Sequence, residues 1–104
     1  FLHLLMISPD CLLCRQCGHE VAIAKDLYPQ PSKLAIGQRN DTILGVPGTL
    51  IQLLQNPHGK NFEVITTKRA DVYKYDKAVV EYSWFEGFSW RLAVCPRCGA
   101  HLGW

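Results

Sequence analysis

Two cysteine pairs, one near each end of the chain, restrict the possible folds more than any other feature. The sequences CRQCG at residues 14–18 and CPRCG at residues 95–99 share one spacing. Two residues between the cysteines let a tight turn direct both thiolates at one ion, and the following glycine can adopt a left-handed conformation. Four thiolates form a closed tetrahedral zinc site that stabilises a small fold. The pattern predicts one structural Zn²⁺ with four ligands: Cys14, Cys17, Cys95 and Cys98.

Disulfides and a redox dithiol are the alternative interpretations of these cysteines. The chain has five cysteines, and an odd number with two C-x-x-C-G units fits a disulfide framework poorly. A thioredoxin-like motif would need a βαβ pattern, which the sequence lacks. Cys11 forms a second C-x-x-C with Cys14 and is expected to be a spare thiol beside the site. Four sulfur ligands leave no open position on the metal, so zinc catalysis is not expected.

Composition describes one small globular domain, assigned to residues 11–104. The 104 residues are 48% hydrophobic and 19% charged, with a net charge of +2. The scattered basic residues predict no nucleic-acid partner, and no apolar run is long enough to predict a membrane span. Residues 1–10 are read as an N-terminal segment: a signal-peptide remnant, a first strand or the boundary of an expressed fragment. Together with the acceptor pattern at Asn40, this apolar start favours a secreted protein over a cytoplasmic one.

Short β-type patterns separated by turns predict a mostly β, antiparallel domain. We expect strands over residues 21–24, 49–54, 62–67, 72–75, 78–80, 90–94 and 101–104. A turn is expected at residues 56–59, and loops at 26–39, around 40–42 and at 81–88.

The three tryptophans all lie between residues 84 and 104. If residues 90–94 and 101–104 pair as antiparallel strands, Trp90 and Trp104 come close together, and the loop brings Trp84 toward both. Three indoles can wall a pocket for a small uncharged ring or, by cation–π attraction, for a methylated ammonium group. The alternative is that the tryptophans only fill the core.

Several segments together resemble the CULT domain family, the thalidomide-binding domains of cereblon. The resemblance rests on EYSWFEGFSW at 81–90, CPRC at 95–98 and HLGW at 101–104, with CRQC at 14–17 and NPHG at 56–59 upstream in the same order. It implies a β-tent fold, in which two antiparallel sheets meet at an angle and are pinned by the four-cysteine zinc site.

The resemblance also implies a ligand site. Trp84, Trp90 and Trp104 would form an aromatic cage for a glutarimide, a thalidomide-type ligand or the cyclic-imide end of a peptide. The backbone at Tyr82 and Trp84 would bind the imide edge, and Asn56 would lie at the pocket mouth. The chain departs from the family at Tyr82, where the family has a histidine, and at Glu86, where it has a proline.

The chain resembles stand-alone CULT proteins, some of which are small and secreted. The Lon-like domain that docks onto a ubiquitin-ligase adaptor has no counterpart here, so no such adaptor is expected as a partner. The leading hypothesis is a non-catalytic module that binds cyclic imides. The alternative is a reader of methylated ammonium ligands, which Glu81 or Glu86 pointing inward would favour. A methionine sulfoxide reductase-like enzyme is less expected, since it would need Cys11 as its nucleophile.

Overall fold

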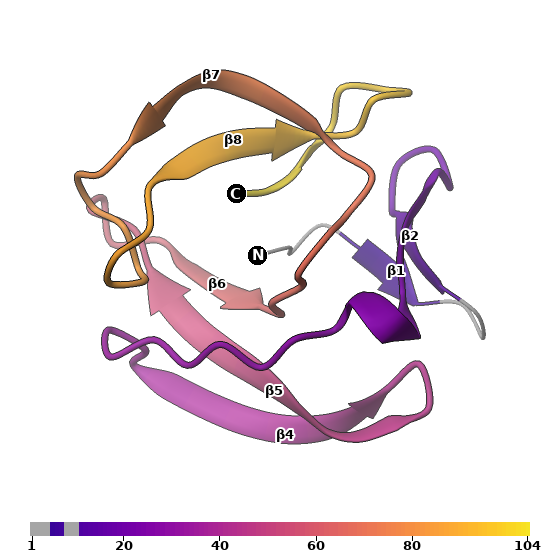
Figure 1. The fold of residues 1–104 in the computed structure, drawn as a ribbon, viewed down its shortest axis with the longest axis horizontal. Coiled ribbons are helices and arrows are strands. Elements are labelled where there is room, and N and C mark those ends of the chain that lie inside the picture. The colour runs from indigo at the N-terminus through magenta and orange to yellow at the C-terminus, as the bar shows by residue number, and fades with distance from the viewer. Residues whose placement is uncertain (1–4, 8–10) are drawn as a thin grey trace.

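The computed structural model describes residues 5–7 and 11–104, which form three antiparallel sheets of three strands each (Figure 1). The first sheet contains β1 (Leu5–Ile7), β2 (Cys11–Cys14) and β3 (Glu20–Ile23). The second contains β4 (Gly37–Ile43), β5 (Val46–Gln55) and β6 (Asn61–Val64). The third contains β7 (Tyr73–Val79), β8 (Trp90–Val94) and β9 (His101–Gly103). A short 3-10 helix, η1 (Ala24–Asp26), follows β3.

The second and third sheets lie on opposite sides of the molecule, and the first sheet lies at one end (Figure 1). The strands of the second sheet run at an angle to those of the third, and the C-terminus lies between these two sheets (Figure 1). The prediction of a mostly β, antiparallel fold is confirmed. The two sheets expected from the resemblance correspond to the second and third, and the first sheet adds a small third one. Of the expected N-terminal segment 1–10, only residues 5–7 are described.

Two groups of buried side chains hold the sheets together. One surrounds the cysteine pairs and includes Leu12, Val21 and Leu102. The other consists of Leu54, Val64 and Phe85, and both Trp84 and Trp104 pack against it. Full burial of one large apolar side chain contributes about 1.5–3 kcal/mol. Phe85, only 2% exposed, therefore anchors the 81–88 loop to the second sheet.

The boundaries of β4 correct the sequence interpretation. Residues 37–39 and the acceptor pattern at 40–42 were expected in loops, but they form most of this strand. Among the described residues β4 pairs only with β5, so its polar side chains face solvent at a sheet edge. Arg39 donates hydrogen bonds to Glu63 and Asp41, each 3.0 Å long. Hydrogen bonds to Glu63 and then Asp41 raise the pKa of Arg39.

Strand β2, over Cys11–Cys14, was not expected, because four residues are too few to show a periodic pattern. Most of the other strands follow the expected pattern with shifted ends. β8 has its expected bounds, β6 ends at Val64 rather than at residue 67, and β7 runs without a break from Tyr73 to Val79. No helix among residues 5–7 and 11–104 is long and apolar enough to cross a membrane.

Candidate functional site

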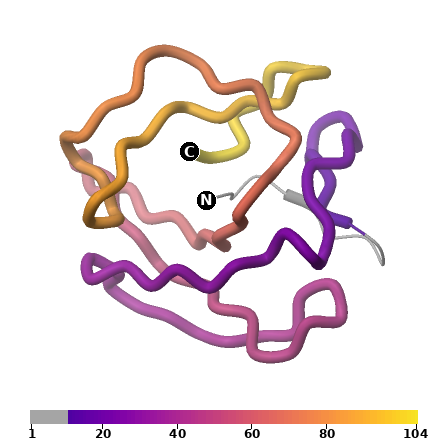
Figure 2. The backbone as a smooth tube through the Cα atoms, in the orientation of Figure 1, coloured from indigo at the N-terminus to yellow at the C-terminus, as the bar shows by residue number. Residues whose placement is uncertain are grey.

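The two cysteine turns share one backbone geometry. The amide of Gly18 donates to the carbonyl of Cys14, and the amide of Gly99 donates to the carbonyl of Cys95, both at 2.9 Å. Both glycines have φ of 79°, so the left-handed conformation expected for each is confirmed. Figure 2 shows the two turns side by side at one end of the molecule, although they lie far apart in the sequence.

The four sulfur atoms form one cluster. All lie within 4.8 Å of one another, with Cys14 Sγ 3.7 Å from Cys98 Sγ and Cys17 Sγ 3.5 Å from Cys95 Sγ. A tetrahedral site with Zn–S bonds of about 2.3 Å places its sulfurs about 3.8 Å apart, so the cluster is close enough to bind a zinc ion. Cys11 is buried in β2 and is not part of this group.

The proton affinities within the cluster diverge. Burial raises the pKa of Cys95, but the backbone amides of Cys98 and Arg97 and the neighbouring thiols outweigh it and lower the pKa to about 6. The amide of Ala100 lowers the pKa of Cys98, but burial and hydrogen bonds with the neighbouring thiols raise it to about 12. Cys95 therefore forms a thiolate readily. A cation that binds to the cluster must displace the proton of Cys98.

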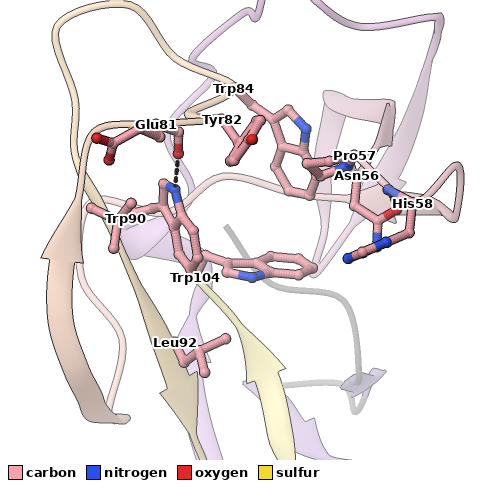
Figure 3. A pocket seen from close by; sticks show the side chains of 10 residues that line it. Asn56, Pro57, His58, Glu81, Tyr82, Trp84, Trp90, Leu92 and Trp104 are labelled. Carbon is pink, nitrogen blue, oxygen red and sulfur yellow. Dashed lines mark hydrogen bonds between the residues drawn. The ribbon is translucent and has the colours of Figure 1, made fainter.

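A pocket of ≈ 690 Å³ lies between the turn after β5, the 81–88 loop, and strands β7 and β8 (Figure 3). Its walls are mainly apolar and aromatic. The five residues predicted to bind a ligand all line it, and this role stays a prediction: Asn56, Tyr82, Trp84, Trp90 and Trp104.

The three indoles form two walls and a floor. The rings of Trp84 and Trp104 meet edge to face, with centroids 4.9 Å apart and an interplanar angle of 80°. Trp104 is further supported by Phe62 at 5.1 Å and His101 at 4.9 Å. In Figure 3, Trp90 stands across the pocket from Trp84, with Trp104 below them. The predicted approach of the three tryptophans is thus present in the structure.

Backbone carbonyls fix two of the indoles by their N–H groups. Trp84 Nε1 donates to the carbonyl of Gln55 at 2.9 Å, and Trp90 Nε1 donates to the carbonyl of Glu81 at 2.7 Å. Both indole N–H groups are thus already hydrogen-bonded to the protein backbone. What these side chains offer to a ligand is therefore mainly their apolar faces.

A buried polar network, which the sequence interpretation missed, holds the backbone of Trp84 in place. Gln52, 1% exposed, accepts a 2.7 Å hydrogen bond from the Ser32 amide and donates a 2.9 Å one to the Gln30 carbonyl. The Ser32 hydroxyl in turn donates to the Trp84 carbonyl. The available signal was a glutamine inside the apolar run of residues 49–54.

The turn after β5 is held by Asn56. Its side-chain oxygen accepts from the amides of His58 and Lys60, at 3.0 and 2.8 Å, and its carbonyl accepts from Gly59 at 3.0 Å. Gly59 has φ of 85°, as the predicted turn requires. This bonding fixes the turn at the pocket wall.

Tyr82 has an unusual backbone and an exposed side chain. Its φ is 63°, a region that residues with a side chain adopt infrequently, and it is 72% exposed. Within the described part of the chain, neither its amide nor its carbonyl makes a hydrogen bond. Figure 3 places its phenol at the pocket, between Trp84 and Trp90.

Comparison with known proteins gives one consistent relative. The chain is 42% identical over 50 residues to cereblon of Xenopus tropicalis, and 40% identical over 50 residues to that of Gallus gallus. These alignments cover 47% of this chain and 11% of each relative. Cereblon of Drosophila melanogaster is 26% identical over 94 residues, which is 88% of this chain and 14% of that protein.

The chain therefore spans only a small part of the relatives that it matches, and no family model matches it. The alignments with the Drosophila relatives nevertheless cover 88% of this chain. The chain is homologous to cereblon, whose C-terminal domain is the CULT domain that the sequence resembles.

Proposed function

We propose that the chain is a zinc-containing, CULT-like binding module that takes a small neutral ring between Trp90 and the pair of Trp84 and Trp104. The ring is a cyclic imide, either a glutarimide, a thalidomide-type compound or the cyclic-imide end of a modified peptide. Two hydrogen bonds carry this proposal. The indole N–H groups of Trp84 and Trp90 donate to the carbonyls of Gln55 and Glu81, respectively. The rings present apolar faces, which suit the two faces of a neutral ring.

The main chain beside the pocket supplies a polar edge for such a ligand. An imide presents a carbonyl, an N–H and a second carbonyl in a row, so it needs both donors and acceptors. The amide and carbonyl of Tyr82 make no hydrogen bond within the described residues, and the left-handed φ of 63° is the kind of backbone strain found at binding sites. This arrangement supports recognition of the imide edge by backbone groups.

The positions of the two candidate carboxylates support a neutral ligand over a methylated ammonium ion. Glu86 does not line the pocket and pairs with Lys33 at 3.2 Å. Glu81 lines the pocket, but its carboxylate lies on the side of Trp90 away from Trp84 (Figure 3). A cation in the pocket would therefore lack a facing carboxylate.

The cysteine cluster supports a structural role for the metal. Four thiolates complete a tetrahedral zinc site and leave no position for water or substrate. Cys11, the other cysteine, is buried at 6% exposure in β2, and a reactive nucleophile requires access to its substrate. Both observations support a binding module rather than a methionine sulfoxide reductase-like enzyme.

The test is a calorimetric titration of the zinc-loaded protein with a glutarimide and, separately, with trimethyl-lysine. We expect saturable binding of the glutarimide alone, and its loss in Trp84→Ala. Tyr73→Ala is the matched control, because Tyr73 is an exposed aromatic on β7 that does not line the pocket. Binding of trimethyl-lysine alone would replace the proposal with the cation reader. No binding of either compound by the folded protein would contradict it.

A further inference from the structure

A second depression, of ≈ 430 Å³, adjoins the tryptophan pocket and shares Trp90 and Trp104 with it. Its lining contains four cationic side chains and no carboxylate. We call it the basic groove, and its cations are Lys68, Arg69, Lys74 and Arg91.

Strand pairing and one loop bring these cations together. Lys68 and Arg69 lie in the segment between β6 and β7, whose position is fixed by a 2.8 Å hydrogen bond from the Lys68 amide to the Asp26 carbonyl. Lys74 is on β7 and Arg91 on β8, and these two strands pair antiparallel, with Lys74 opposite Ala93. The sequence shows one basic dipeptide, whereas the fold assembles a patch of four positive charges.

The positive charge of the groove is poorly neutralised. Arg69 Nε lies 3.7 Å from Asp26 Oδ1, a long contact. Arg91 donates to the uncharged carbonyls of Asp76 and Lys74, at 3.0 and 3.4 Å. In the described part of the chain, neither Lys68 nor Lys74 forms an ion pair.

Asp71, the carboxylate nearest in sequence to the Lys68–Arg69 dipeptide, is engaged elsewhere. Asp71 pairs with His19 at 2.8 Å and does not line the groove. Apart from the long contact of Arg69 with Asp26, these clustered cations have no paired carboxylate among the described residues, and such a cluster creates a local positive potential that attracts anions. The lining also contains apolar side chains, among them Ala70, Val72 and Ala93.

We propose that the basic groove binds an acidic peptide segment, whose carboxylates pair with Lys68, Lys74 and Arg91. The aliphatic stems of its Asp or Glu side chains lie against Ala70 and Val72. A peptide suits the groove better than a nucleic acid, because four cations and a net charge of +2 neutralise too few phosphates for backbone tracking. This proposal does not depend on ring binding in the tryptophan pocket.

The experiment is an NMR titration of the zinc-loaded chain with an acetylated, amidated hexaglutamate peptide. Hexaglutamine is the neutral control, and hexathymidylate is the nucleic-acid arm. We expect hexaglutamate alone to shift the amides around Lys68, Lys74 and Arg91. Its affinity should fall about tenfold or more between about 0.05 and about 0.5 M salt, because exposed charge pairs are screened.

Two charge-matched variants separate the groove from general attraction. Lys68→Gln/Lys74→Gln should weaken hexaglutamate binding about fivefold, as expected for two exposed charge contacts. Lys25→Gln/Lys77→Gln removes the same charge at exposed positions outside the groove and should change affinity less than about twofold. Equal weakening in both variants, no binding of hexaglutamate at low salt, or tighter binding of hexathymidylate would each overturn the proposal.

Discussion

Trp90 Nε1 donates a 2.7 Å hydrogen bond to the carbonyl of Glu81, nine residues earlier in the chain. This bond closes the aromatic loop on itself and fixes the plane of the Trp90 ring. It also places Tyr82, the next residue after Glu81, at the pocket wall. One side chain thus supplies a wall of the pocket and holds the backbone that forms its edge.

These two contributions of Trp90 can be separated by substitution. Trp90→Ala removes both the ring face and the N–H, and should lower glutarimide affinity about tenfold or more. Trp90→Phe keeps an aromatic face but loses the bond to Glu81, and should lower affinity only about two- to threefold, since one neutral hydrogen bond contributes modestly. Calorimetry measures both without relying on tryptophan fluorescence.

Phe88→Ala is the matched control for Trp90, because Phe88 belongs to the same loop but does not line the pocket. Its glutarimide affinity should stay within about twofold of the unsubstituted chain, as expected for an exposed position outside the site. Equal losses in Trp90→Ala and Trp90→Phe would show that the loop anchor matters and the ring face does not.

The network behind Trp84 predicts different effects on stability and on binding. Gln52→Leu leaves the Ser32 amide and the Gln30 carbonyl without their side-chain hydrogen bonds. It should lower the free energy of unfolding by about 1–3 kcal/mol. Ser32→Ala removes the hydroxyl that contacts the Trp84 carbonyl, so it should lower glutarimide affinity about two- to fivefold. Urea unfolding and calorimetry measure the two effects separately.

Gln38→Leu provides the comparison for Gln52, because Gln38 lies directly opposite it on β4 and is exposed. Its unfolding free energy should change by less than about 0.5 kcal/mol. If Gln52→Leu is equally tolerated, the buried hydrogen bonds of Gln52 do not stabilise the loop before Trp84.

Features that depend on local spacing could be predicted from the sequence. The turn geometry at Gly18 and Gly99 follows from the C-x-x-C-G pattern, and the clustering of four sulfurs follows from the repetition of that pattern. The bounds of β8 follow from a β-type pattern, apolar except for Arg91, that begins at Trp90 and ends at the second cysteine pair.

Two other features, which depend on strand pairing, could not be predicted in this way. β4 is polar throughout its exposed length, and its partner β5 and the ion pairs of Arg39 hold it in the sheet. Lys74 and Arg91 join Lys68 in one groove only because β7 pairs with β8 and follows the 65–72 segment. Neither relationship leaves a periodic pattern in the sequence.

Removal of the metal should unfold the chain. Structural zinc provides about 10–16 kcal/mol of binding free energy in small domains, which is comparable with the whole stability of a domain, about 5–15 kcal/mol. Addition of a strong chelator should therefore abolish the cooperative thermal transition, followed by circular dichroism. Cys14→Ser should lose bound zinc in the same way.

Cys11→Ser is the matched control for the metal ligands, since Cys11 is a buried cysteine outside the sulfur cluster. It should retain one zinc per chain by elemental analysis, as expected for a four-ligand site that is complete without it. Loss of zinc from Cys11→Ser but not from Cys14→Ser would reassign the ligand set.

Zinc binding should release a defined number of protons. Thiolates bind the metal, so each ligand that is protonated in the metal-free chain releases a proton on binding. If the metal-free chain is unfolded, its cysteines have the ordinary thiol pKa of about 8.5, and about four protons are released per zinc near pH 7. Zinc affinity should therefore fall as the pH falls, because protons compete with the metal for the thiolates. Calorimetry in buffers of different ionisation enthalpy measures the number of released protons. In the folded cluster the pKa of Cys95 is lowered to about 6, so Cys95 is already a thiolate there at pH 7. Release of only about three protons or fewer would therefore contradict unfolding of the metal-free chain.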